Sequence, residues 1–256
     1  MRGLAGKGVL VSGGTRGIGL AAARRFLEEG CRVHICGHDA ADLETALDEL
    51  AERADGRVTG SVCDVADEAA VTTLVEIAEE AVGGIDVLAN NAGIAWREPF
   101  LDITAEHWDR IQAVNVRGMF LVAQRVAKTM VAVGRSGSII NMASTNAIGG
   151  EEDYAHYNAS KGAVLQLTRT MAVELGAYGI RVNALCPGYI DTPLNAAIAA
   201  GEGEGFADDY ARDRIPLGRA GTADEVAAAY AFLASDEASF VHGAAFVIDG
   251  GQTAVM

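Results

Sequence analysis

A glycine-rich turn between a short apolar strand and a helix lies near the start of this 256-residue chain. Residues 9–12 have a buried-strand pattern, residues 13–19 read Gly-Gly-Thr-Arg-Gly-Ile-Gly, and residues 20–29 have a helical pattern. Glycines let the backbone approach a pyrophosphate, and the amino end of the helix offers it free N–H groups. The spacing is Gly-x-x-x-Gly-x-Gly, not the commoner Gly-x-Gly-x-x-Gly, and a flexible loop without a ligand is the alternative. In this context we predict the first unit of a dinucleotide-binding domain.

Strand and helix patterns alternate along the rest of the chain, without a repeat or a linker. Further strands are predicted at residues 32–36, 58–62, 85–89, 138–142, 181–185 and 245–248. Helices are predicted at residues 40–54, 67–82, 104–128, from Tyr157 to about 177, and at 222–234, where Thr222 and Glu225 have capping-box spacing. This order predicts a single α/β domain over residues 1–256, a doubly wound, Rossmann-like, seven-stranded parallel sheet with helices on both faces.

Tyr157 and Lys161 are four residues apart and therefore share one face of the predicted helix. A lysine ammonium beside a phenol favours the phenolate and lowers the phenol pKa from about 10. A tyrosine so tuned can exchange a proton with an alcohol or carbonyl oxygen, and the Ser144 hydroxyl can bond the same oxygen. Tyr154 lacks such a partner, because Asn158 stands four residues after it. The alternative is that the Tyr–Lys pair is a chance feature of a helix surface.

Other polar residues follow predicted strands, at the sheet edge where ligands bind in open parallel sheets. The sequence Asn-Asn-Ala-Gly at 90–93 is a tight polar turn after one strand. Asp64, after another, could accept a hydrogen bond from an adenine amino group or could cap the next helix. Asn115 lies among apolar residues of a helix, where it either satisfies structural hydrogen bonds or kinks the helix and supports a water chain.

The tip of the second strand bears on the choice of cofactor. NAD-binding sites usually place a carboxylate there to hold the ribose hydroxyls. Here the tip is Gly37, followed by His38 and Asp39, and Arg16 lies in the glycine turn. We therefore predict a preference for NADP(H) over NAD(H). The alternative is that Asp39 holds the ribose and Arg16 is a solvated loop residue.

Composition argues against several classes of partner. The formal charge of −15 and the pI of about 4.7 disfavour nucleic acid and anionic membranes. No apolar run is long enough to span a bilayer, and the first residues do not resemble a secretory signal. Cys31, Cys36, Cys63 and Cys186 lack zinc spacing, so we expect no metal and read them as buried thiols of a reducing, cytoplasmic compartment.

The segment at about 190–215 is acidic and punctuated by glycine, which is typical of a mobile substrate flap and equally of a surface insertion.

Polar residues near Tyr157 and Lys161 favour a polyol, sugar or hydroxylated ketone as substrate, although surface solvation explains the acidic side chains equally well. The expected substrate contacts are Ser144, Asn146, Tyr157 and Tyr189, and the neighbouring polar residues are Glu151, Glu152, Asp153 and Tyr154.

Together these motifs resemble the short-chain dehydrogenase/reductase family over nearly the whole chain. The matching positions are Gly13, Gly17 and Gly19, with Ser12 where Thr is usual, then Asp64, residues 90–93, Asn115, Ser144, Tyr157, Lys161, Pro187, Gly188 and Thr192. The Tyr-x-x-x-Lys spacing differs from that of the enoyl-reductase branch, and the chain lacks the additional C-terminal substrate domain of the epimerase branch.

The resemblance implies an oxidoreductase that interconverts a secondary alcohol and a ketone. It implies that Tyr157 is the general acid and base, Ser144 holds the substrate oxygen, Lys161 lowers the Tyr157 pKa and binds the nicotinamide ribose, and Asn115 anchors a relay water. The alternative function is that of a cofactor-binding sensor or scaffold protein. The resemblance also implies that the chain assembles as a homotetramer. The cofactor contacts expected from the loops and the resemblance are Gly13, Thr15, Arg16, Gly17, Ile18, Gly19, His38, Asp64, Val65, Asn91, Ala92, Gly93, Tyr157, Lys161, Pro187, Gly188, Ile190 and Thr192.

Overall fold

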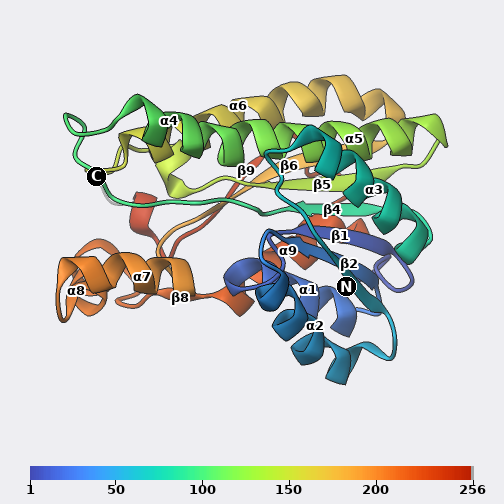
Figure 1. Ribbon diagram of the computed structural model, residues 1–256, viewed down its shortest axis with the longest axis horizontal. Helices are drawn as coiled ribbons and strands as arrows, with labels where there is room; N and C mark the ends of the chain where they lie inside the picture. The colour runs from blue at the N-terminus through green and yellow to red at the C-terminus, as the bar shows by residue number, and fades with distance from the viewer. Residues whose placement is uncertain (255–256) are drawn as a thin grey trace.

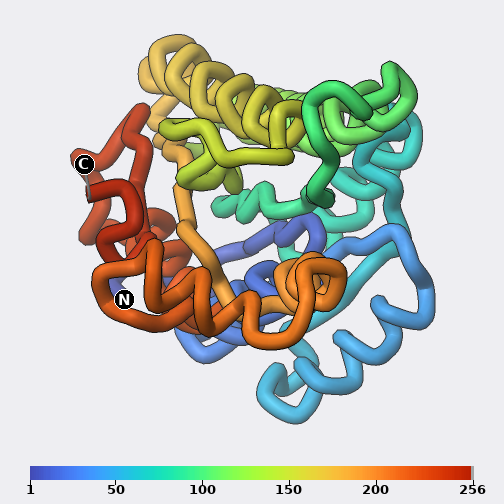
Figure 2. Tube along the Cα trace, turned by 90° about the vertical axis from the view of Figure 1, so that its left-hand side faces the viewer, coloured from blue at the N-terminus to red at the C-terminus, as the bar shows by residue number. Residues whose placement is uncertain are grey.

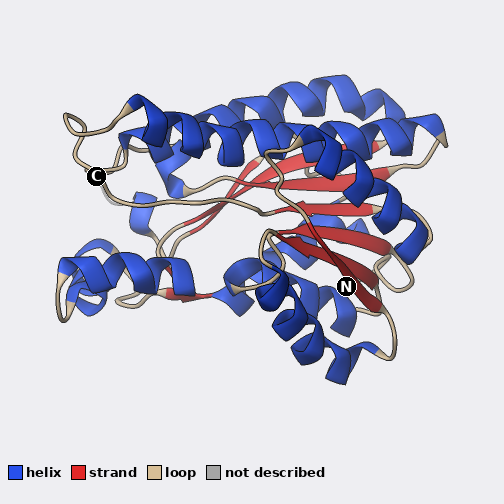
Figure 3. Ribbon diagram, in the orientation of Figure 1, coloured by secondary structure: helices blue, strands red, loops and turns tan. Residues whose placement is uncertain are grey.

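A parallel seven-stranded sheet forms the centre of the computed structural model, which describes residues 1–254 (Figures 1 and 3). The strand order is β3-β2-β1-β4-β5-β6-β9, so the crossover at β1 and β4 divides the sheet into two halves. The strands are β1 (Gly8–Ser12), β2 (Arg32–Gly37), β3 (Val58–Val62), β4 (Val87–Asn90), β5 (Gly137–Met142), β6 (Ile180–Pro187) and β9 (Ala245–Ile248). The predicted fold class is confirmed.

Helices cover both faces of the sheet (Figure 1). One face carries α1 (Gly17–Glu28), α2 (Ala40–Ala54) and α9 (Ala223–Ala234), and the other carries α3 (Glu68–Val82), α4 (Ala105–Gln112), α5 (Met119–Ala132) and α6 (Ala155–Leu175). Short 3₁₀ helices cover Thr145–Ala147, Gly176–Tyr178, Asp236–Ala238 and Gln252–Ala254. This is the layered arrangement expected when parallel strands are joined by right-handed crossovers.

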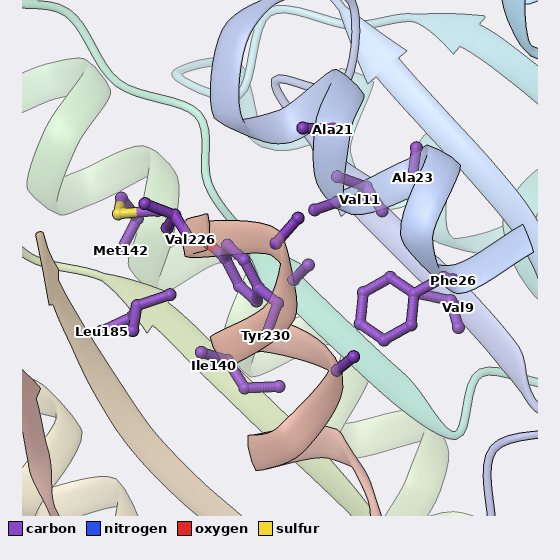
Figure 4. Close-up of a cluster of buried hydrophobic side chains, with 14 of the residues drawn as sticks. Val9, Val11, Ala21, Ala23, Phe26, Ile140, Met142, Leu185, Val226 and Tyr230 are labelled. Atoms are coloured by element: carbon purple, nitrogen blue, oxygen red, sulfur yellow. The ribbon is translucent and has the colours of Figure 1, made fainter. Parts of the chain in front are cut away.

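Each strand contributes to two hydrophobic cores, because successive side chains point to opposite faces. Val9 and Val11 pack in the core beneath α1 and α9, whereas Leu10 packs in the core beneath α3 and α5. Phe26 and Tyr230 are fully buried in the first core, which Figure 4 shows in close-up. Burying a side chain the size of Phe26 stabilises a fold by roughly 1.5–3 kcal/mol.

The predicted boundaries at 58–62, 245–248 and 40–54 agree with the observed elements, and most other ends shift by one to three residues. The capping box is also confirmed, because Thr222 Oγ1 accepts the Glu225 N–H while the Glu225 carboxylate accepts the Thr222 N–H. The helical pattern predicted over 104–128 is found within a longer helical run, which is not all α-helical. A π-helix (Ala113–Gly118) separates α4 from α5, and such insertions widen the helix at sites with unusual local bonding.

The segment predicted as a flap folds into two helices, α7 (Pro193–Glu202) and α8 (Phe206–Arg214), labelled in Figure 1. Between them the chain turns at Gly203 and Gly205, whose φ angles of 107° and 84° suit glycine. A two-stranded sheet of β7 (Ile190–Asp191) and β8 (Gly221–Thr222), which was not predicted, closes the base of this segment.

The structure bears on two of the expectations from composition, namely the state of the cysteines and the presence of membrane-spanning helices. All four cysteines are buried and free, as predicted. Over residues 1–254, no helix combines the length and the apolar character needed to cross a bilayer.

Candidate active site

The carboxyl ends of the strands open into a cavity of about 1090 Å³. Figure 2 looks towards this edge, where the orange α7–α8 segment crosses below the yellow-green loop that precedes α6. Apart from Gly19 and Asn115, every residue predicted for the site lines this one cavity. Segments far apart in the sequence therefore contribute to a single site.

The glycine turn forms the part of the cavity next to α1. Gly13 and Gly17 have φ angles of 62° and 55°, which other residues rarely adopt. Gly19 lies behind the turn, where an added Cβ atom would be 2.0 Å from the Gly13 carbonyl oxygen. The amino end of α1 has no side-chain cap and no acidic residue in its first turn. These features suit the pyrophosphate of a dinucleotide, because helix N–H groups are free to bind an anion.

Ser12 joins the glycine turn to the polar turn at 90–93. Its Oγ accepts the N–H groups of Asn91 and Ala92 at 3.0 and 3.1 Å, and donates to Asn90 Oδ1 at 3.2 Å. The Asn91 side chain donates to the Gly13 carbonyl at 3.1 Å. The polar turn thus supports the cofactor loop from behind as well as lining the cavity.

Arg16, in the glycine turn, lines the cavity together with His38, which follows β2, and Asp64, which follows β3. Asp39 does not line it, and its carboxylate caps α2 by accepting the Asp42 N–H at 2.9 Å. That bond is the main reason that the pKa of Asp39 is lowered. Arg16 is largely exposed, and its nearest carboxylate oxygen, on Asp42, is 4.0 Å away.

Asp64 turns its carboxylate onto its own loop, where it accepts the Ala66 N–H at 2.9 Å. The alternative prediction that Asp64 caps the following helix is wrong. The cap of α3 is Asp67, which accepts the N–H groups of Ala69 and Ala70. Asp64 nevertheless remains at the cavity wall.

The reacting centre predicted from the sequence lies where β5 and α6 meet. Ser144 and Tyr157 line the cavity together with Lys161, which is 2 % exposed. Burial raises the pKa of Tyr157 to about 12, whereas the neighbouring Ser144 hydroxyl acts to lower it. Burial lowers the pKa of Lys161 to about 8.

Lys161 was expected to lower the pKa of Tyr157, and this role stays a prediction. Its Nζ donates to the Met142 carbonyl at 2.8 Å and lies 5.5 Å from the centroid of the phenol ring. Burial has the largest influence on the pKa of Tyr157 in this arrangement, because it disfavours the charged phenolate.

Asn115 lies within the π-helix and is fully buried. Its Oδ1 accepts the Ile94 N–H at 2.8 Å, while its Nδ2 donates to the Ile94 carbonyl and to Ser160 Oγ at 2.9 and 3.1 Å. It therefore satisfies structural hydrogen bonds at the π-helical turn, and its support of a water chain stays a prediction. It stands behind the cavity wall formed by Gly93 and Lys161.

Several cavity residues had no role in the sequence-based site. Arg97 pairs with Asp153 at 2.9 Å and with Glu202 at 2.6 Å, so it connects the loop after β4 to α7. Tyr154, which lacks a lysine partner, is buried against the Arg97 guanidinium. Other lining residues that were not predicted are Cys36, Gly37, Cys63, Ala143, Phe206, Tyr210, Arg214 and Gln252. Phe206, Tyr210 and Arg214 lie in the segment predicted as a flap, but no local pattern distinguished them individually, because their contacts form between distant segments.

This fold, with a dinucleotide loop and a Ser–Tyr–Lys group at one sheet edge, defines a class of nicotinamide-dependent oxidoreductases. A family model described as "Enoyl-(Acyl carrier protein) reductase" matches residues 13–253. The chain belongs to the short-chain dehydrogenase/reductase family. It is an NAD(P)-dependent enzyme of that family, which acts on alcohols and ketones.

Individual relatives match over almost their full length. The chain is 38 % identical to a gluconate 5-dehydrogenase of Gluconobacter oxydans, covering 98 % of this chain and 96 % of the relative. It is 39 % identical to an NADP-dependent (R)-specific alcohol dehydrogenase of Lentilactobacillus kefiri, covering 98 % of both. The crystal structure of levodione reductase superposes with a TM-score of 0.93 at 38 % identity, covering 98 % of this chain and 99 % of that one.

Proposed function

We propose that Tyr157, Ser144 and Lys161 perform hydride-coupled interconversion of a secondary alcohol and its ketone. The observation that carries this proposal is their convergence, in one cavity, with the glycine turn that fits a dinucleotide. The spacing of four between Tyr157 and Lys161 favours a carbonyl substrate over an enoyl substrate. The bound nicotinamide supplies or accepts the hydride, and the protein supplies position and polarity.

In the direction of ketone reduction, the Tyr157 phenol donates its proton to the carbonyl oxygen. The Ser144 hydroxyl, which donates to Asn146 Oδ1 in this structure, turns to donate its single hydrogen bond to the same oxygen. The pKa of about 12 keeps the phenol protonated at neutral pH, which suits a general acid. Lys161 in its ammonium form stabilises the phenolate that results and holds the nicotinamide ribose. Asn115 supports the wall behind Lys161 and anchors a water that returns the proton.

The test is Tyr157→Phe, followed through cofactor absorbance with a panel of ketones. We expect the variant to lose nearly all turnover and to keep its affinity for the cofactor, because only the hydroxyl is removed. Activity within tenfold of the wild type would show that another group moves the proton. A wild-type protein that binds cofactor but turns over no ketone would favour the alternative of a sensor or scaffold.

We infer that NADP(H) is preferred over NAD(H). Arg16 and His38 line the cavity beyond the glycine turn, while the Asp39 carboxylate is engaged in capping α2. An arginine binds a phosphate through a bidentate fork, and no carboxylate at Gly37 repels it. We expect Arg16→Ala to lower kcat/KM for NADP(H) and to leave that for NAD(H) unchanged. A wild-type preference for NAD(H), or an unchanged ratio in the variant, would contradict the inference.

We also propose a cytoplasmic homotetramer with a substrate-binding flap formed by α7 and α8. Trp108 on α4, Phe120 on α5 and Val173 on α6 are exposed by 39, 39 and 85 %, so apolar surface is available on these neighbouring helices for symmetric burial. The buried free cysteines suit a reducing compartment. Light scattering that gave a monomer at micromolar concentration would contradict the tetramer.

A further inference from the structure

The carboxylate of Glu151 lines the reaction cavity and, like those of Asp64 and Glu152, forms no ion pair among residues 1–254; it is the one of the three that is hydrogen-bonded to both Asn146 and Tyr210. Its Oε1 accepts the Tyr210 hydroxyl at 3.0 Å, and its Oε2 accepts the Asn146 side-chain amide at 2.9 Å. An ionised carboxylate has about four lone-pair positions. Acceptor capacity therefore remains at Glu151 after both protein bonds are formed.

Hydrogen bonds fix this carboxylate relative to the reacting centre. Asn146 Nδ2 also donates to Asn158 Oδ1 at 2.8 Å, and Asn146 Oδ1 accepts the Ser144 hydroxyl at 3.1 Å. Both N–H donors of the Asn146 amide, and one acceptor position of its oxygen, are thus engaged within the protein. A continuous path leads from Glu151 through Asn146 to Ser144, the group proposed to hold the substrate oxygen.

The flap completes the same network from the other side. The Tyr210 hydroxyl, which bonds Glu151, accepts the Gln252 side-chain amide at 2.9 Å. The Tyr210 ring packs against Tyr189, with centroids 4.8 Å apart. The carboxylate is consequently held between the loop before α6 and helix α8, and does not swing freely in solvent.

The charge of Glu151 disfavours a negatively charged group in direct contact with it. Burial is the main cause of the raised pKa values of Tyr157 and Tyr210, and the negative charge of Glu151 raises both further, so this charge acts within the reaction cavity. Arg97 is already paired with two carboxylates. Arg214 also lines the cavity, and its charge lowers the pKa of Tyr210. A ligand beside Glu151 is therefore best accommodated when it donates a hydrogen bond and carries no negative charge.

We propose that Glu151 is a specificity-determining residue, which accepts a hydrogen bond from a hydroxyl group beside the reacting carbonyl. The preferred substrates are then neutral hydroxyketones and the vicinal diols formed from them. This inference rests on the proposed alcohol–ketone chemistry. It assigns Glu151 no proton-transfer step, since Tyr157 supplies the proton.

The kinetic test uses three carbonyl compounds of four carbons, namely 3-hydroxy-2-butanone, 2-butanone and the anion 2-oxobutanoate. We expect Glu151→Gln to lower kcat/KM for the hydroxyketone about tenfold, as for the loss of a hydrogen bond to a charged group. Activity on 2-butanone should stay within about threefold, and activity on 2-oxobutanoate should rise because the repulsion is removed. Glu44→Gln, which removes an exposed carboxylate from α2, is the matched control and should leave all ratios unchanged.

A binding test separates this inference from the proposed function. Calorimetry on the Tyr157→Phe protein loaded with oxidised cofactor, which should not turn over, compares meso-2,3-butanediol with 2-butanol. Adding Glu151→Gln should weaken diol binding about tenfold and leave 2-butanol binding unchanged. If the wild type reduces no ketone, the proposed function is wrong, and this binding ratio still decides the role of Glu151. Unchanged ratios after Glu151→Gln, or a wild-type preference for 2-oxobutanoate, would overturn the inference.

Discussion

The glycine turn and the α7–α8 segment line the same cavity but are held in place by different means. At the glycine turn the contacts are between backbones, and even one added methyl group at Gly19 would meet the Gly13 carbonyl at 2.0 Å. Helix α7 buries none of its described side chains, and α8 buries Ala211. The segment is held mainly by polar contacts of a few side chains, including Arg97 with Glu202 and Tyr210 with Glu151.

This difference follows from what each region has to bind. A dinucleotide is the same in every turnover, so rigid backbone packing suits it. Contacts between polar side chains at the cavity rim break at lower cost, which suits a segment that admits a substrate. The comparison predicts that small substitutions at the glycine turn abolish cofactor binding. Larger substitutions in the flap should change substrate affinity without changing the fold.

The largest effect is expected for Gly19→Ala. The new Cβ must displace the Gly13 carbonyl, and with it the loop that would hold the pyrophosphate. We expect cofactor affinity to fall at least about 100-fold, measured by fluorescence titration with NADPH, because most phosphate contacts depend on that loop. Gly201→Ala is the matched control, since nothing lies within 4 Å of the added Cβ at that position in α7. Equal affinities in the two variants would remove the distinction between the regions.

A smaller effect is expected for Arg97→Met, which breaks the ion pair with Glu202 in the flap and the ion pair with Asp153 in the loop before α6. We expect KM for the ketone to rise about tenfold, as for the loss of a partly buried charged contact, with less change in kcat. The melting temperature should change little, because these pairs contribute little to the core. Arg212→Met, on the exposed side of α8, is the control. A variant of Arg97 that unfolded early would show that the pairs are structural.

The same contrast explains how much could be predicted from the sequence. The sheet, the glycine turn and the Tyr157–Lys161 pair follow from local patterns, because period, spacing and glycine position are written in consecutive residues. Arg97 and Tyr210 could not be found in this way, since their partners are distant in the chain. The π-helix at Asn115 was missed for a similar reason, because its cause is a set of bonds to Ile94 and Ser160.

The free energy of unfolding should depend on pH through His34, which lies on β2 in the half of the sheet that carries the glycine turn. Its ring nitrogens bond Thr59 and Ser61 at 2.8 and 2.9 Å, and burial lowers its pKa to about 4 from 6.5. The unfolded chain therefore binds the proton more readily. The stability contribution is complete above pH 6.5 and is lost as the pH falls towards 4, by at most about 3 kcal/mol.

We expect His34→Gln to flatten this decline, measured as the urea midpoint between pH 7 and 5. Gln retains hydrogen-bonding groups but does not titrate in this range. His107→Gln serves as the control, because this half-exposed histidine pairs with Glu98 at the surface. A decline of the same steepness in His34→Gln and the wild type would assign the acid sensitivity to other groups.

The smallest effect is expected in the core behind both regions, at Tyr230 on α9. Figure 4 shows its ring among apolar side chains such as Ile140 and Leu185, and its buried hydroxyl has no hydrogen-bond partner among the described residues. A buried polar group without a partner costs about 1–3 kcal/mol, so Tyr230→Phe should leave stability unchanged or raise it by about 1 kcal/mol. In a chain of this size, that corresponds to an increase in melting temperature of roughly 2–4 °C.

Tyr178→Phe is the matched control for the same substitution, because Tyr178 is 55 % exposed and its hydroxyl is available to solvent. It should shift the melting temperature by less than about 1 °C, as expected of a surface change. Neither variant should alter cofactor affinity or KM, since neither tyrosine lines the cavity. A Tyr230→Phe protein that lost more than about 1 kcal/mol would mean that the hydroxyl has a partner. A change in KM would show that a change of packing at α9 alters the flap through Thr222, which joins α9 to β8. The core at α9 and the flap could then no longer be treated as independent.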